Sequence, residues 1–129
     1  MNKKLLLSLP TDISEDRLQA ACHSYMMHTY PPPAFYGRYF SVPNGGSRNK
    51  IEAMKFKATG LTAGIPDYFL LSDLGKFIPI EFKLSTTTLT NRQPLVHDNF
   101  SSVGVKVHIV RNGQEFLDVV DKHFAIPNQ

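Results

Sequence analysis

Two apolar segments on either side of a short turn constrain the fold of this 129-residue chain more than any other feature of its sequence. Residues 67–72 and 77–84 are rich in Phe, Leu or Ile, and the residues between them are Asp73-Leu74-Gly75-Lys76. Apolar runs joined by a glycine-containing turn are typical of a β-hairpin. The sequence therefore predicts two antiparallel strands over residues 67–84.

Helix and strand patterns alternate on both sides of this hairpin. The other expected strands cover residues 39–42 and 105–110. The expected helices cover about residues 12–30, 47–58, 91–103 and a last segment that Asn112 caps. Strands that alternate with helices favour an α/β fold, in which helices flank a central mixed β-sheet. No internal repeat or long linker divides the chain, so we expect one domain over residues 1–129.

The helix expected at residues 12–30 has one buried face. Asp12 and Glu15 form a capping-box pattern at its start, and the prolines at 31–33 end it. Apolar or small side chains recur along it at helical spacing, at Leu18, Ala21, Cys22, Tyr25 and Met26. Before this helix we expect residues 1–11 to form an N-terminal arm or edge strand. At the other end of the chain, we expect residues 124–129 to form a frayed tail.

The helix expected at residues 47–58 combines an apolar stripe with basic faces. Ile51, Met54 and Ala58 are expected to face inward. The candidate phosphate contacts, which would be DNA contacts if the partner is DNA, are the basic residues of this segment and the asparagine of the preceding Gly-Gly turn: Asn44, Arg48, Lys50, Lys55 and Lys57. The alternative is ordinary turn chemistry beside a solvated basic face.

Composition excludes some classes of protein and permits others. No stretch approaches the roughly 20 apolar residues of a membrane span, so we expect no membrane partner. A single cysteine, Cys22, allows no intrachain disulfide, which fits a reducing compartment such as the cytoplasm. A net charge of +3 and a pI near 9.1 permit nucleic-acid binding without establishing it.

Three charged residues converge at one end of the predicted hairpin. Glu81 and Lys83 lie on the same face of their strand, whereas Phe82 points to the core. The partner strand brings Asp67 close to this pair. Apolar neighbours tolerate such charges only when the charges neutralise one another or a metal. Carboxylates suit Mg²⁺ or Mn²⁺, so Asp67 and Glu81, with the backbone carbonyl of Phe82, are the candidate ligands.

Four sequence blocks in order resemble the VRR-NUC branch of the PD-(D/E)xK nuclease superfamily. The resemblance extends over roughly residues 15–115. The blocks are Pro43-Asn44-Gly45-Gly46-Ser47-Arg48, Lys57-Ala58-Thr59-Gly60-Leu61-Thr62-Ala63-Gly64-Ile65-Pro66-Asp67, Ile80-Glu81-Phe82-Lys83 and Gln93.

The resemblance implies a restriction-endonuclease-like core and a catalytic set of Asp67, Glu81, Lys83, Glu15 and Gln93. Glu15 corresponds to the acid on the family's first helix, although a helix-start acid favoured by the dipole is the alternative. Gln93 corresponds to the family's helix glutamine, and it also completes a capping box with Thr90. Members that consist of this one domain are typically phage or bacterial, which would place a phage-encoded chain in the host cytoplasm.

The expected function is metal-dependent hydrolysis of DNA phosphodiesters. By resemblance we expect selectivity for branched DNA, as in a Holliday-junction resolvase, and a homodimer. The apolar residues available for a dimer interface are Leu5, Leu6, Leu7, Phe35, Tyr36, Tyr39 and Phe40. Two alternatives remain open: a less selective nuclease acting on nicks, flaps or single strands, and a DNA-binding module that does not cleave.

Overall fold

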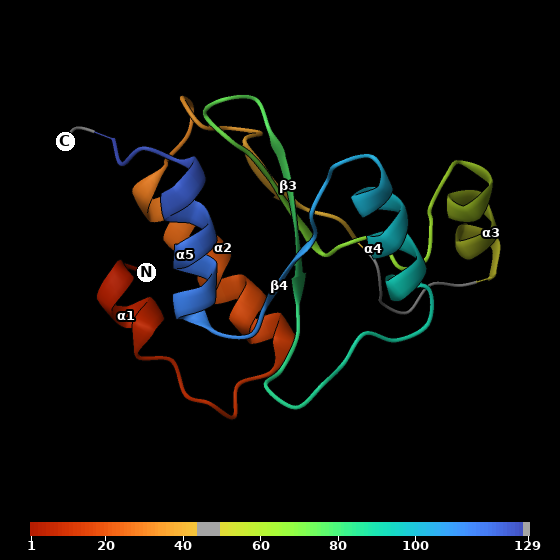
Figure 1. Cartoon of the computed structure of the whole chain (residues 1–129), viewed down its shortest axis with the longest axis horizontal. Coiled ribbons are helices and arrows are strands. Elements are labelled where there is room, and N and C mark those ends of the chain that lie inside the picture. Colours follow the sequence, from red (N-terminus) through yellow and green to blue (C-terminus); the bar gives the residue numbers. More distant parts are fainter. Residues whose placement is uncertain (44–49, 128–129) are drawn as a thin grey trace.

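The computed structural model describes residues 1–43 and 50–127, which form a mixed sheet with helices on both faces (Figure 1). In these residues the helices are α1 (Lys3–Leu7), α2 (Glu15–Thr29), α3 (Lys50–Ala58), α4 (Gln93–Ser102) and α5 (Gly113–His123). The strands are β1 (Tyr39–Ser41), β2 (Tyr68–Leu71), β3 (Phe77–Phe82) and β4 (His108–Val110). The predicted element order is confirmed, with α1 as an addition.

The sheet has the order β1-β2-β3-β4. β2 pairs antiparallel with both β1 and β3, as the predicted hairpin requires, and β4 joins β3 in parallel. Ile80 of β3 lies opposite Tyr68 on one side and His108 on the other. The expectation of a mixed α/β sheet is therefore correct.

One face of the sheet carries the core. Tyr68, Ile80, Phe82 and Val110 belong to the main hydrophobic cluster, which α1, α2 and α5 cover (Figure 1). The buried residues of α2 are Leu18, Ala21, Cys22, Tyr25 and Met26, the stripe that the sequence predicted. Since side chains alternate along β3, Glu81 lies on the opposite face from Ile80 and Phe82.

Residues near both ends of the described part are more regular than expected, and residues 128–129 of the predicted tail lie outside that part. Residues 3–7 form α1 instead of an arm or edge strand, and Leu6 of this helix is buried. The tail was expected to fray from Phe124, but that ring is only 3% exposed and its centroid lies 5.1 Å from that of Tyr30. The N–H of Ala125 then donates to Asp73 across 2.7 Å, so the hairpin turn anchors the start of the tail.

The N-terminal cap of α2 also differs from the prediction. Ser14, not Asp12, is the N-cap residue, and its hydroxyl accepts a hydrogen bond from the N–H of Arg17. The helix consequently begins at Glu15. Serine at this position satisfies a first-turn N–H as well as aspartate does, so local sequence alone did not distinguish the two candidates.

The prediction of an inward apolar stripe on α3 is wrong. Ile51 and Met54 are 68% and 69% exposed, and Ala58 is also exposed. Figure 1 shows α3 at the opposite end of the molecule from α1 and α5. α1, α2 and α5 already cover the core face of the sheet. The apolar side chains of α3 therefore cannot pack against that face. The expected start of this helix, Ser47, lies outside the described residues.

Among residues 1–43 and 50–127, the structure contains no helix that is both long and apolar enough to span a bilayer.

Candidate active site

Asp67 immediately precedes β2 and forms hydrogen bonds to residues on both sides of it, Val42 after β1 and Phe82 of β3. Its backbone carbonyl accepts a hydrogen bond from the N–H of Val42 at 3.0 Å. Its side-chain Oδ2 accepts a hydrogen bond from the N–H of Phe82 at 2.9 Å. Because the N–H and C=O of a strand residue point to the same neighbour, the Phe82 carbonyl also faces the Asp67 side of β3.

Glu81 is a buried carboxylate with an incomplete set of partners. The residue is 1% exposed. Its Oε1 lies 3.2 Å from Nε2 of His97, whereas its Oε2 is buried without a hydrogen-bond partner among the described residues. Burial raises the pKa of Glu81 well above its usual range, and the neighbouring Asp67 carboxylate raises it further. Most buried polar atoms are hydrogen-bonded, so an acceptor that has no partner in the described part of the chain makes Glu81 a candidate binding residue.

Lys83 is nearly as buried as Glu81, with 6% of its surface exposed. It follows the last residue of β3, and its backbone N–H donates to the carbonyl of Val110 at 3.0 Å. Its ammonium group lowers the pKa of Glu81, opposing the effects of burial and of Asp67. The structure thus brings Asp67, Glu81 and Lys83 together, as the sequence predicted.

The two helix residues of the predicted catalytic set differ in their placement. Glu15 is the first residue of α2, and its charge contributes to the raised pKa of Glu81. Gln93 turns to its own helix start, where its Oε1 accepts a hydrogen bond from the N–H of Thr90 at 2.9 Å. The expected capping box does not set the start of α4, because Arg92 is the N-cap residue and its side chain forms no capping bond. A catalytic role for Gln93 stays a prediction.

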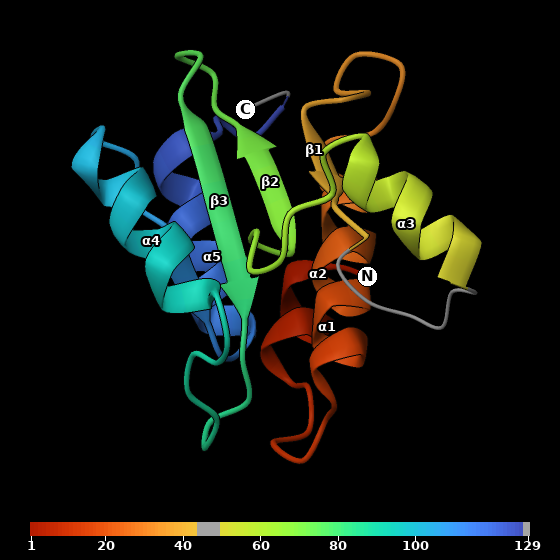
Figure 2. The same ribbon diagram turned by 90° about the vertical axis from the view of Figure 1, so that its right-hand side faces the viewer.

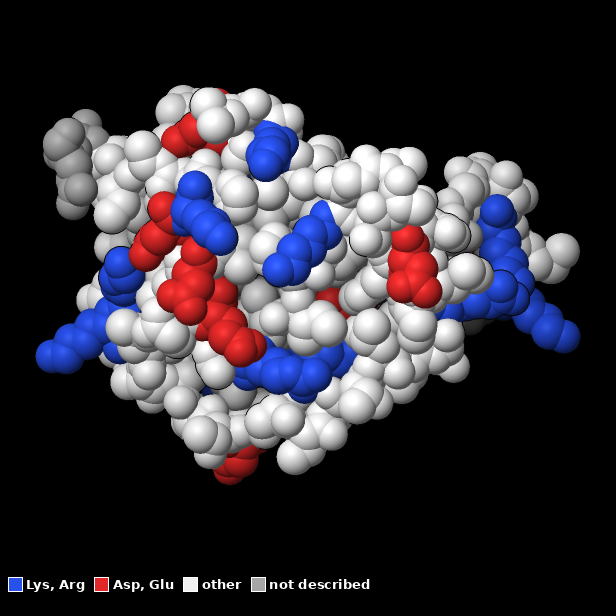
Figure 3. Space-filling view, viewed as in Figure 1, with Lys and Arg blue, Asp and Glu red and all other residues white. Residues whose placement is uncertain are grey.

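The predicted DNA contacts lie at one end of the molecule or outside the described part. Lys50, Lys55 and Lys57 are exposed on α3. Figure 3 shows basic side chains gathered at the end of the molecule that α3 occupies. Asn44 and Arg48 lie outside the described residues.

Sequence reasoning missed two residues beside the cluster. His97 lies on α4, one helical turn after Gln93, and no sequence spacing links it to its partner Glu81, which lies on a strand. Burial lowers the pKa of His97. Arg111 follows β4, and its Nη1 donates to the carbonyls of Leu84 and Thr87, the latter at 2.7 Å. Arg111 therefore fixes the loop that follows Lys83.

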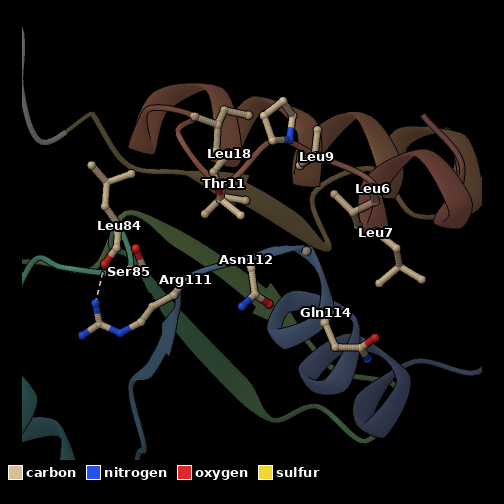
Figure 4. A pocket seen from close by; sticks show the side chains of 13 residues that line it. Leu6, Leu7, Leu9, Thr11, Leu18, Leu84, Ser85, Arg111, Asn112 and Gln114 are labelled. Atoms are coloured by element: carbon tan, nitrogen blue, oxygen red, sulfur yellow. Dashed lines mark hydrogen bonds between the residues drawn. The ribbon is translucent and has the colours of Figure 1, made fainter.

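A cavity on the other side of Arg111 is separate from the carboxylate cluster. It lies between the α1–α2 connection and the start of α5, and Figure 4 shows leucine side chains around it with Arg111 at one end. Its lining includes Leu6, Leu9, Leu18 and Asn112 but neither Asp67 nor Glu81. The guanidinium group of Arg111 is directed to the Leu84 carbonyl (Figure 4).

The cluster fits a hard divalent cation that keeps part of its water shell. The described residues contain no group of three or more His, Cys, Asp or Glu side chains placed to enclose a metal. Mg²⁺ does not require such a cage, because it is usually bound by one or two carboxylates, waters and substrate phosphates. Glu81, whose Oε2 has no hydrogen-bond partner among residues 1–43 and 50–127, and the neighbouring Asp67 match that donor set.

The cost of burying Glu81 is testable in the absence of metal. In EDTA we expect Glu81→Gln to stabilise the protein by on the order of 1 kcal/mol, because a neutral amide avoids the penalty of a buried carboxylate. For a chain of this length the unfolding temperature should rise by about 4 °C. Calorimetric unfolding measures this shift, with the exposed Asp12→Asn as control. A Glu81→Gln protein less stable than the wild type would contradict the strained-carboxylate interpretation.

Comparisons with known proteins support the fold. No family model and no curated protein sequence matches the chain. Its structure is similar to a solved structure described as a "VRR_NUC domain protein", with a TM-score of 0.65 and 18% sequence identity. The similarity covers 88% of this chain and 93% of that chain. The two chains therefore share a fold over nearly their whole lengths.

Proposed function

We propose that the chain is a nuclease domain of the VRR-NUC type that hydrolyses DNA phosphodiesters with the help of Mg²⁺ or Mn²⁺. The observation that carries the proposal is the buried, incompletely partnered Glu81 beside Asp67 and Lys83. The fold shared with a VRR_NUC domain protein supports it. A reducing cytoplasm is the proposed setting, since Cys22 is the one cysteine of the chain.

Each residue of the cluster has a separate proposed role in the reaction. Asp67 and Glu81 would bind the cation through carboxylate oxygens, and the Phe82 carbonyl faces the same side of β3. A bound divalent cation lowers the pKa of a coordinated water and offsets charge on the phosphate. Lys83 would orient the attacking water and stabilise the negative charge of the pentacovalent state. Glu15 and Gln93 are proposed to support the site from their helices.

The first test is cleavage of supercoiled plasmid with Mn²⁺, Mg²⁺ or EDTA. We expect nicked or linear products with either metal and none in EDTA. A protein that retards DNA in a gel but yields no product with either metal would be a binding module, and the proposal of a nuclease would be wrong.

The proposed substrate is branched DNA, in particular a four-way junction. Less selective cleavage of nicks, flaps or single strands is the second candidate. A panel of a four-way junction, a flap, a nicked duplex and a single strand separates them. Preferential paired cuts in the junction support a resolvase, and equal rates on all four support the second candidate.

The exposed lysines of α3 are proposed to contact DNA phosphates. The triple variant Arg48→Ala, Lys50→Ala, Lys55→Ala should bind DNA more weakly with little dependence on sequence. The log–log slope of affinity against salt should fall by up to about 0.9 for each phosphate that the variant no longer neutralises. Fluorescence anisotropy at several salt concentrations measures both quantities.

A matched control for this variant removes Lys4 and Lys122, which are exposed at the end of the molecule opposite α3. The control should bind like the wild type. If the triple variant also keeps the wild-type affinity and salt slope, the basic residues around α3 are only solvated.

A homodimer is proposed because paired cuts in a junction need two sites related by twofold symmetry. In the structure, some of the apolar residues expected at the dimer interface are buried and others are exposed. Leu6 and Tyr39 are buried in the core and Phe35 is partly buried against it, whereas Leu5, Leu7, Tyr36 and Phe40 are 54%, 47%, 85% and 39% exposed. The exposed four remain candidates for an interface.

Light scattering at micromolar concentration should give twice the chain mass of 14.5 kDa. Tyr36→Ser with Phe40→Ser should shift the mass to that of a monomer, if these rings form the interface. A wild-type monomer that remains monomeric on junction DNA would remove the argument for paired cuts and favour the less selective nuclease.

A further inference from the structure

His97 approaches the carboxylate cluster from the face of the sheet opposite the core. α4 lies over that face, away from α5 (Figures 1 and 2). The side chain of His97 is 12% exposed, and its Nε2 lies 3.2 Å from Oε1 of Glu81. α4 has no fully buried residue, so this contact joins a partly exposed helix to a buried strand residue.

The contact makes the two oxygens of Glu81 unequal. Oε1 has the imidazole of His97 as its partner, whereas Oε2 has no partner among the described residues. A carboxylate with one oxygen held by a donor loses its freedom to rotate about its last bond. The unheld oxygen is then the one presented to a ligand. Groups that orient a metal ligand in this way commonly change metal affinity by about 10- to 100-fold when they are removed.

We propose that His97 is a positioning residue, which holds Oε1 of Glu81 so that Oε2 is free to bind the divalent cation. The inference rests on the proposed function for the identity of the bound group. It assigns His97 no contact with the cation or with DNA. It requires only that an imidazole N–H donates to the carboxylate.

Three substitutions separate hydrogen bonding from packing. His97→Gln keeps a side-chain N–H donor. His97→Phe keeps a ring of similar breadth but has no donor, and His97→Ala removes both. His28→Ala, at an exposed position on α2, is the matched control. Unfolding in EDTA checks that each variant is folded; if His97→Ala is not, His97→Phe gives the donor-free result.

The readout is the dissociation constant for Mn²⁺, measured by electron paramagnetic resonance of the free ion without DNA. We expect His97→Ala and His97→Phe to weaken Mn²⁺ binding by about 10-fold or more, and His97→Gln to recover most of the loss. Cleavage by the donor-free variants should approach the wild-type rate when Mn²⁺ is raised to saturation. Wild-type Mn²⁺ affinity in His97→Phe would overturn the proposal, as would a His97→Gln variant as weak as His97→Ala.

The same titration distinguishes this inference from the proposed function. If the wild type binds Mn²⁺ but cleaves no DNA, the proposed nuclease activity fails, and the affinities of the variants still decide the role of His97. If the wild type binds no Mn²⁺, the positioning role is overturned together with the metal site.

Discussion

Asp67→Asn, Glu81→Gln and Lys83→Ala are each expected to lower the rate of DNA cleavage by about 100- to 1000-fold or more, while the fold stays intact. On the proposed function, the first two changes remove a negatively charged ligand of the cation, and the third removes the charge that would orient water and stabilise the transition state. Single-turnover cleavage of labelled DNA in saturating Mn²⁺ measures the loss. Circular dichroism and thermal unfolding show whether each variant is folded.

Matched controls use the same residue types outside the cluster. Asp16→Asn and Lys76→Ala change exposed side chains and should cleave at the wild-type rate. If one of the three cluster variants also keeps a near wild-type rate, that residue is not part of the catalytic machinery. Equal losses in the controls would point instead to a general effect of charge on DNA binding.

Gly64→Ala is expected to lower the stability of the fold strongly. Gly64 has a φ of +87°, and a Cβ there would lie 2.7–2.8 Å from the backbone and Cβ of Arg92, the residue that precedes α4. Overpacking of this kind costs about 1–3 kcal/mol. The positive φ adds about 1 kcal/mol for a residue with a side chain. We therefore expect urea unfolding to show a loss of about 2–4 kcal/mol in total.

Gly37→Ala is the matched control, because Gly37 has nearly the same φ of +88° and nothing within 4 Å of an added Cβ. It should lose only the contribution of the positive φ. Gly64→Ala should also reduce cleavage, since the loop that precedes Asp67 and the start of α4 must move apart. Equal losses of stability in the two variants would show that Arg92 moves away from the added Cβ without lowering the free energy of unfolding.

The local parts of the fold follow from sequence. The apolar stripe of α2 appears where its spacing predicted it. Asn112 caps α5 by accepting a hydrogen bond from the N–H of Glu115, as their separation of three residues predicted. The hairpin is equally local, because its turn residues and apolar runs are contiguous. This hairpin also brought Asp67 to Glu81, so the centre of the candidate site followed from sequence as well.

The features that the sequence did not predict depend on how segments distant in the chain pack against one another. The spacing of Ile51 and Met54 does indicate a helix, but it does not reveal that other helices already cover the core. His97 contacts a residue 16 positions earlier in the chain, across the space between a helix and a strand. No periodicity links such a pair. Phe124 is buried for the same reason, since its partner Tyr30 ends a helix near the start of the chain.

Anomalous X-ray diffraction from crystals of the protein soaked with Mn²⁺ locates the bound cation directly. We expect a peak bound by Asp67 and by Oε2 of Glu81, at the roughly 2.0–2.2 Å typical of small hard cations with oxygen ligands. The Phe82 carbonyl should lie on the same side of the ion. Crystals in which Mn²⁺ binds elsewhere, or in which Glu81 stays unliganded at saturating Mn²⁺, would contradict the assignment of this cluster as a metal-dependent nuclease centre.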